Sequence, residues 1–163
     1  MIIWIIGKSG SGKTYFAKKI FKYYQNKKKI FWIDGDEFRK FITYNLGYDY
    51  KSRMQNSKKI IDFCRYLESK KYVVICSILS IFKEHQKLNR KIFKKYYQIY
   101  LKAEQKTLEI RNKKKIYSKI KNIVSKDIEF PEPYKSDLII INNFKNGQKI
   151  FQIILKELNA KLL

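Results

Sequence analysis

The sequence predicts an α/β protein, in which five parallel strands form one sheet with helices on both of its faces. The first observation is that short apolar runs alternate along the chain with longer amphipathic segments. The second is that the runs are apolar at successive positions, as expected for strands that are buried on both faces. With 163 residues, the chain has the length of one domain, and we expect a single domain over 1–163.

Each element of this fold has its own signal. Strands are expected at the apolar runs 2–6, 30–33, 72–76, 97–101 and 138–141. Helices are expected where apolar residues recur at helical spacing, in 13–24, 36–46, 53–70, 82–96 and 148–158. Residues 111–133 have no clear period and carry both prolines, so we expect a basic, partly mobile lid at about 111–130, with plain solvated surface as the alternative.

The composition indicates a cytoplasmic protein without a membrane span. Cys64 and Cys76 have neither metal-ligand spacing nor paired partners, which favours a reducing compartment. The apolar runs are far shorter than the ~20 residues that span a bilayer, and Gly7 interrupts the first of them at once, unlike a signal peptide. The formal charge of +23 would suit an anionic partner, but the lysines are spread along the chain, so nucleic acid is not the expected partner.

The stretch 7–14, Gly-Lys-Ser-Gly-Ser-Gly-Lys-Thr, lies between the first predicted strand and the first predicted helix. It matches the phosphate-binding pattern G-x-x-x-x-G-K-[ST], so the expected fold is a three-layer α/β/α P-loop NTPase. The glycines let backbone N–H groups point at phosphate oxygens, Lys13 reaches the β- and γ-phosphates, and the Thr14 hydroxyl coordinates Mg²⁺. The residues expected to bind the phosphates are Gly7, Ser9, Gly10, Ser11, Gly12, Lys13 and Thr14.

Two aspartates, Asp34 and Asp36, follow the second predicted strand. Ligands of open α/β sheets gather at the carboxyl ends of strands, so both carboxylates face the phosphate loop if the second strand lies near the first. The strand 72–76 is followed by Ser77 and not by the aspartate that many P-loop proteins place there for Mg²⁺. The acidic function is therefore expected from Asp34 or Asp36, with a helix N-cap as the alternative reading.

Further motifs, in their order and spacing, resemble those of adenylylsulfate kinases, which transfer the γ-phosphate of ATP to the ribose 3′-hydroxyl of adenylyl sulfate. The resemblance runs from residue 1 to about 142. The family's Asp-Gly-Asp-x-x-Arg, Leu-Gly-aromatic and Arg-x-x-Asn are present at 34–39, 46–48 and 53–56. Of its Ser-x-x-Ser-Pro-Tyr-Arg, at 77–83, both serines are present, and Ile81, Phe82 and Lys83 replace the last three residues. Its Glu-x-Arg-Asp-Pro-Lys-Gly-Leu-Tyr is present in part at 109–117.

The resemblance implies a role for each matching residue. It implies that the acceptor nucleotide is held by Asp36, Arg39, Tyr48, Arg53, Asn56, Ser80, Lys83, Lys114 and Ile123, and that Arg111 belongs to the ATP site. The expected catalytic residues are Lys13, Asp34 and Asp36. Asp36 is expected to orient or deprotonate the 3′-hydroxyl, and Asp34 to serve the Mg²⁺ on Thr14, although the two aspartates can exchange roles.

The departures from the family fall on the acceptor side. Ile123 stands where the family's Asn-Phe-Thr-Gly places a phenylalanine, and Lys83 stands for an arginine, which loses bidentate geometry. This pattern favours the same reaction on a different nucleotide, and a relative of the family phosphorylates cytidine diphosphoramidate in capsule decoration.

The expected function is that of a cytoplasmic kinase that uses ATP and Mg²⁺ to phosphorylate the ribose 3′-hydroxyl of cytidine diphosphoramidate or adenylyl sulfate. A homodimer is one candidate assembly. Two alternatives stay open: a kinase for a sugar or shikimate-like hydroxyl, and a nucleic-acid-binding ATPase or polynucleotide kinase. The second would use the lysines and aromatic residues of 18–29 or 91–102, which also fit amphipathic elements with aromatic side chains in the core.

Overall fold

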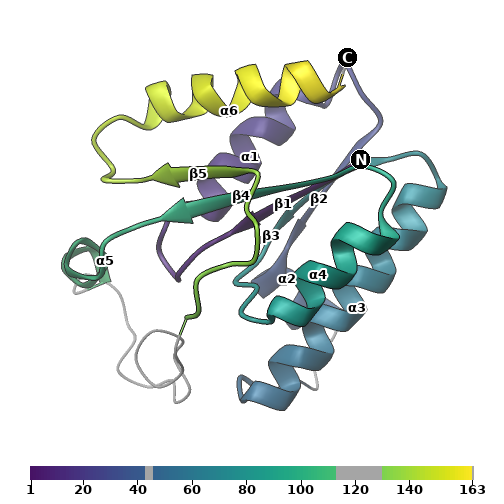
Figure 1. Ribbon diagram of the computed structural model, residues 1–163, viewed down its shortest axis with the longest axis horizontal. Coiled ribbons are helices and arrows are strands. Elements are labelled where there is room, and N and C mark those ends of the chain that lie inside the picture. The colour runs from purple at the N-terminus through teal and green to yellow at the C-terminus, as the bar shows by residue number, and fades with distance from the viewer. Residues whose placement is uncertain (43–45, 113–129, 163) are drawn as a thin grey trace.

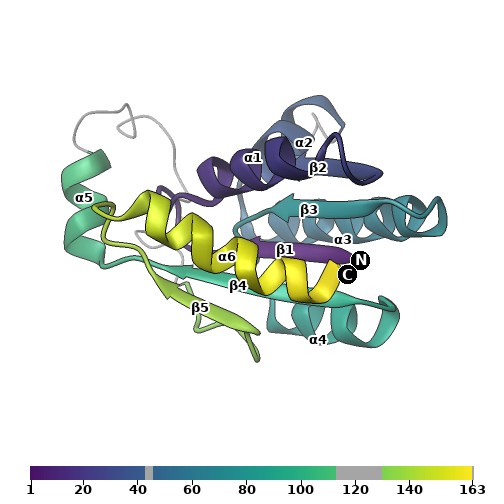
Figure 2. The same cartoon turned by 90° about the horizontal axis from the view of Figure 1, so that it is seen from above.

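The computed structural model describes residues 1–42, 46–112 and 130–162, and in these ranges five parallel strands form one sheet. The strands are β1 (Ile2–Ile6), β2 (Ile30–Asp34), β3 (Val73–Ser77), β4 (Tyr96–Lys102) and β5 (Leu138–Ile141). Their order across the sheet is β2-β3-β1-β4-β5, and each neighbouring pair is parallel (Figure 2). The predicted parallel α/β sheet is confirmed.

Helices cover both faces of this sheet, as Figure 1 shows. The helices are α1 (Lys13–Tyr24), α2 (Gly35–Phe41), α3 (Tyr50–Ser69), α4 (Lys83–Ile92), α5 (Gln105–Asn112) and α6 (Gly147–Leu162). Helices α1 and α6 pack on one face, α2, α3 and α4 lie on the other, and α5 follows the end of β4. No helix in the described ranges is long and apolar enough to cross a membrane.

The alternation of side chains along β1 divides the core between the two faces. Ile3 and Ile5 point to α1 and α6, whereas Ile2, Trp4 and Ile6 point to the face of α3. All five side chains of β1 are fully buried, and each buried isoleucine contributes about 1.5–3 kcal/mol. This central strand is therefore a rigid support for the loop that follows it.

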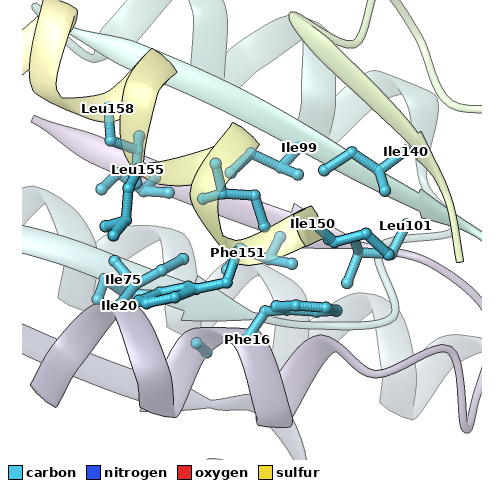
Figure 3. Close-up of a cluster of buried hydrophobic side chains, with 14 of the residues drawn as sticks. Phe16, Ile20, Ile75, Ile99, Leu101, Ile140, Ile150, Phe151, Leu155 and Leu158 are labelled. Carbon is cyan, nitrogen blue, oxygen red and sulfur yellow. The ribbon is translucent and has the colours of Figure 1, made fainter. Parts of the chain in front are cut away.

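Figure 3 shows the buried side chains on the face of α1 and α6, where the two helices lie over the same face of the sheet. Phe16 and Ile20 of α1 and Phe151 of α6 meet side chains of β3, β4 and β5, including Ile75 and Ile99. These contacts fix the start of α1, and with it the end of the phosphate loop.

The strand β3 lies between β1 and β2, in a strand order that the sequence left open. The structure differs from the expected elements at three places. The predicted helix 82–96 ends at Ile92, because Tyr96 already pairs with Ile2 in the sheet. The helix α5 was not predicted, and the predicted helix 36–46 ends at Phe41 as α2. Most of the predicted lid, 113–129, lies outside the described residues.

Candidate active site

The phosphate loop depends on two glycines whose side-chain positions are occupied by other atoms. Gly7 has φ +153°, and a Cβ there would lie 2.5 Å from the carbonyl oxygen of Leu101 and 2.6 Å from Ser11 Oγ. Gly12 has φ +99°, and its Cβ would lie 2.9 Å from Asn142 Nδ2. Both positions need glycine, because an L side chain is strained at these φ values and would collide with the neighbouring strands.

The loop is also held by hydrogen bonds from distant parts of the chain. Asn142, the residue after β5, is buried and donates from Nδ2 to the carbonyl oxygen of Ser11 at 2.9 Å. Lys8 Nζ donates to Gln105 Oε1 of α5 at 3.1 Å. The curve of the loop is therefore fixed before any phosphate binds, which is the preorganisation that anion binding requires.

Lys13 is a desolvated cation at the first residue of α1. Its Nζ donates to the carbonyl oxygen of Lys8 at 2.8 Å. Burial lowers the pKa of Lys13 to about 8, against the carboxylates of Asp36 and Asp34, which raise it. A desolvated ammonium group beside a helix N-terminus is a strong site for an oxyanion. Burial destabilises the positive charge of the ammonium group, and a bound anion stabilises it again.

The Asp34 carboxylate caps α2 and also accepts hydrogen bonds from Thr14 and Ser77. Its Oδ1 accepts hydrogen bonds from the backbone N–H groups of Asp36 at 3.0 Å and Glu37 at 3.4 Å, and so caps α2. Its Oδ2 accepts from Thr14 Oγ1 at 2.7 Å and from Ser77 Oγ at 3.0 Å. The N-cap therefore aims the second oxygen of the carboxylate at the phosphate loop.

The strand order explains how Asp34 reaches that loop although β3 separates β2 from β1. Ser77 pairs in register with Asp34 on one side and with Ile5 on the other, so it is the residue between them. Serine is small, and its hydroxyl donates to the carboxylate. The end of β3 thus leaves room for Asp34 in the place where other P-loop proteins carry an aspartate of their own.

The oxygens of Thr14 and Asp34 fit a hard divalent cation. They lie 2.7 Å apart, and oxygen is the ligand that Mg²⁺ prefers. The described residues contain no group of three or more His, Cys, Asp or Glu side chains that could hold a metal ion. A cation here would therefore take its other ligands from water and from substrate phosphates, as Mg²⁺ commonly does.

The predicted acceptor residues form a second group around Tyr48. The guanidinium carbons of Arg39 and Arg53 lie 5.0 and 5.5 Å from the centroid of the Tyr48 ring. Arg39 Nη1 donates to the carbonyl oxygen of Gly47 at 2.6 Å, and Arg53 Nε donates to that of Tyr48 at 2.6 Å. The two arginines therefore hold the backbone at Tyr48 and place two positive charges over its ring.

Asp36 lines the same cavity as Lys13, Arg39 and Arg53. Burial lowers the pKa of both Arg39 and Arg53, whereas the charge of Asp36 raises the pKa of each arginine and of Lys13. This carboxylate is thus close to the phosphate loop and to the arginines at the same time. A group that handles a proton between a donor phosphate and an acceptor hydroxyl needs this position.

One cavity of about 490 Å³ joins both groups. Of the predicted site residues, it is lined by Ser9, Gly10, Gly12, Lys13, Thr14, Asp34, Asp36, Arg39, Tyr48, Arg53, Asn56 and Ser80.

The other predicted residues are placed differently. Gly7 and Ser11 shape the loop without lining the cavity, and Lys83 is exposed at the start of α4, also outside the lining. Lys114 and Ile123 lie outside the described residues, as does the side chain of Arg111.

Ser80 lines the cavity, but it also belongs to the framework of the fold. It has φ +52°, its hydroxyl accepts from Trp4 Nε1 at 3.2 Å, and its carbonyl oxygen accepts from Gln86 Nε2 at 2.8 Å. These bonds hold the turn after β3 in a left-handed conformation that few residues adopt. Ser80 therefore fixes the backbone of the cavity wall near the predicted acceptor residues.

Two residues that support the site were missed as candidates. Asn142 donates a hydrogen bond to the phosphate loop, and Ser77 donates one to Asp34. Each is a polar residue directly after or at the end of an apolar strand, which is the only signal that the sequence offers for them.

Comparisons with known proteins identify the family of the chain. A family model described as adenylylsulphate kinase matches residues 1–141. The cytidine diphosphoramidate kinase of Campylobacter jejuni subsp. jejuni serotype O:2 is 34% identical over 164 residues, which cover 96% of this chain and 95% of that protein. The adenylyl-sulfate kinase of Clostridium kluyveri is 26% identical over 169 residues, which cover 99% of this chain and 85% of that protein.

A solved structure supports the fold. The APS kinase CysC of Mycobacterium tuberculosis, in complex with AMPPNP and APS, matches with a TM-score of 0.86 at 22% identity, over 97% of this chain and 96% of that one. The similar proteins are kinases, as predicted. The family model and the relatives together show that the chain belongs to the adenylylsulphate kinase family.

Proposed function

We propose that this chain is a nucleotide kinase that transfers the γ-phosphate of ATP to the ribose 3′-hydroxyl of cytidine diphosphoramidate, with adenylyl sulfate as the second candidate acceptor. The observation that carries the proposal is the cavity that joins the phosphate loop to Tyr48 and its two arginines. The 34% identity to the Campylobacter cytidine diphosphoramidate kinase supports the first acceptor over the second.

On the donor side, the backbone N–H groups of 7–14 and the Lys13 ammonium stabilise the negative charge of the transferring phosphoryl group. Thr14 and Asp34 would hold Mg²⁺, which supplies further charge stabilisation when it is bound. Asp36 orients the acceptor hydroxyl and accepts its proton. Its place in the cavity that Lys13, Arg39 and Arg53 also line supports this role.

On the acceptor side, Tyr48 stacks on the base and the two arginines bind the anionic 5′ group. Arginine suits that task, because its guanidinium binds phosphate oxygens in a bidentate manner. We interpret Ile123, where the family has phenylalanine, as the loss of one stacking partner. A pyrimidine loses less stacking than adenine there, and this reasoning favours the cytidine acceptor.

The alternatives are less well supported. A sugar or shikimate-like acceptor has no base for Tyr48 to stack on, and a polynucleotide does not fit the family to which the chain belongs. We also propose that the protein acts in the cytoplasm, as one domain over 1–163 and as a homodimer. Analytical ultracentrifugation tests the last point, and a monomeric active enzyme would reject it.

The test measures kcat/KM for both acceptors with ATP and Mg²⁺, and uses ³¹P NMR to locate the new phosphate. We expect phosphate on the ribose 3′ position and cytidine diphosphoramidate at least as good an acceptor as adenylyl sulfate. A preference of ~10²-fold or more for adenylyl sulfate, about 2.7 kcal/mol, would make adenylyl sulfate the acceptor. A phosphate on the 5′ side, or on no nucleotide, would reject the proposal.

A further inference from the structure

The carboxylate of Asp34 uses its full capacity to accept hydrogen bonds. An ionised carboxylate offers about four lone-pair sites. Here two backbone N–H groups reach Oδ1, and the hydroxyls of Thr14 and Ser77 reach Oδ2. The orientation of this side chain is therefore determined from two sides, and Ser77 is one of the groups that determine it.

The direction of the Ser77 hydroxyl is itself set by another side chain. Trp32 Nε1 lies 3.1 Å from Ser77 Oγ. An indole N–H can only donate, so the Ser77 oxygen accepts from Trp32 and must direct its single proton elsewhere. Asp34 Oδ2 lies 3.0 Å away and the carbonyl oxygen of Ile33 lies 3.5 Å away, so the carboxylate receives the better hydrogen bond.

The surroundings hold these groups firmly. Ser77 is 3% exposed at the end of β3, and the Trp32 ring lies 6.4 Å from the ring of Phe21 on α1. Trp32 and Asp34 lie two residues apart on β2, so both point to the same face of that strand. The indole, the hydroxyl and the carboxylate thus form a connected chain that ends at Thr14.

We propose that Trp32 and Ser77 are positioning residues for the cation site, and that Trp32 acts through Ser77. The inference rests on the proposed function, in which Thr14 and Asp34 hold Mg²⁺. If the Thr14 oxygen turns to a cation, Ser77 still holds Oδ2 of Asp34 in place. Partners of metal-ligating side chains commonly contribute to metal affinity in this way.

The experiment measures Mn²⁺ binding by EPR at saturating ADP, which needs neither turnover nor an acceptor. Ser77→Ala should raise the dissociation constant of Mn²⁺ by ~10–100-fold. Trp32→Phe keeps a ring beside Phe21 and removes the N–H, so it should raise the constant less. The double variant should match Ser77→Ala alone, because in the described part of the chain the hydrogen bonds lead from Trp32 to Asp34 through Ser77.

Two controls separate positioning from folding. Phe31→Leu changes an aromatic side chain of the same strand that contacts Phe63 and Tyr72, and it should leave Mn²⁺ binding unchanged. The affinity for ADP in EDTA should also stay unchanged in every variant. Ser77→Thr keeps a hydroxyl and should restore most of the Mn²⁺ affinity.

Three results would overturn the inference: unchanged Mn²⁺ binding in Ser77→Ala, an equal loss of metal-free ADP affinity, or additive effects of the two substitutions. The proposed function fails separately. A wild-type protein that binds Mn²⁺ and ADP but phosphorylates neither acceptor would reject that function and leave the positioning roles standing.

Discussion

The phosphate half and the acceptor half of the cavity are built in different ways. In the phosphate half, backbone groups and short side chains stand at the carboxyl ends of β1, β2 and β3, and each is held by a hydrogen bond from another strand or loop. In the acceptor half, the arginine side chains of α2 and α3 donate to backbone carbonyl oxygens of the segment between these helices and lie over the ring of Tyr48. Tyr48, in that segment, is 43% exposed, whereas Ser11 is fully buried.

This difference indicates which half of the cavity can change when the substrate changes. The chemistry of phosphoryl transfer requires donors that are fixed in advance, so the phosphate half is built into the sheet. The side chains of α2, of α3 and of the segment between them that line the cavity lie outside the sheet, so acceptor specificity can change while the reaction stays the same. Variants of the two halves should therefore fail in different kinetic parameters.

The largest effect is expected where the two halves meet. Asp36→Asn keeps the size of the side chain but removes its charge and basicity, so kcat should fall by ~10²–10⁴-fold with little change in the affinity for ATP and Mg²⁺. Steady-state kinetics and nucleotide titration measure both quantities. Glu37→Gln, on the same helix and outside the cavity lining, is the matched control. A large loss of nucleotide affinity in Asp36→Asn would instead assign the metal to Asp36 and the hydroxyl to Asp34.

Removing the cation of the phosphate half should come next. Lys13→Ala should lower kcat by ~10²-fold or more, while the melting temperature stays within a few degrees, because the lysine serves an anion site and not the core. Lys18→Ala, which removes an exposed lysine of the same helix, should behave as wild type in both assays. Wild-type turnover in Lys13→Ala would refute the assignment of the phosphate loop.

A smaller effect is expected from the aromatic ring of the acceptor half. Tyr48→Ala should raise KM for the acceptor by about 10-fold or more, since a base loses roughly 1–3 kcal/mol when its stacking partner is removed. KM for ATP should not change. Tyr48→Phe keeps the ring and should stay close to wild type, and an equal loss in this variant would show that the ring is not a stacking surface.

The smallest effect is a dependence of nucleotide binding on pH. The pKa of Lys13 is about 8 in the free protein, and a bound phosphate raises it. Binding of ADP above pH 8 must therefore take up a proton, and the affinity should fall by about tenfold between pH 8 and pH 9.5. Calorimetry in buffers of different ionisation enthalpy measures the proton uptake. Persistence of the same uptake in Lys13→Ala would assign it to another group.

Features that depend on neighbouring residues could be predicted from the sequence. The phosphate loop could be predicted because its glycines, Lys13 and Thr14 must follow one another closely to wrap one phosphate. The strands and most helices could be predicted because a burial pattern is local. The end of α4 could not, because Tyr96 pairs in the sheet with β1, which is distant in the sequence. The helix α5 was not predicted either.

The residues that hold Asp34 and the phosphate loop in place depend on the tertiary structure. Ser77 meets Asp34 across 43 positions, and Asn142 meets the phosphate loop across 131. These contacts follow from the insertion of β3 between β1 and β2 and from the place of β5 beside β4. Several strand orders bury the same apolar runs equally well, so the hydrophobic pattern does not specify one of them. The contacts of Asp34 Oδ2 form only when the sheet assembles, because their donors, Thr14 and Ser77, come from two other segments of the chain.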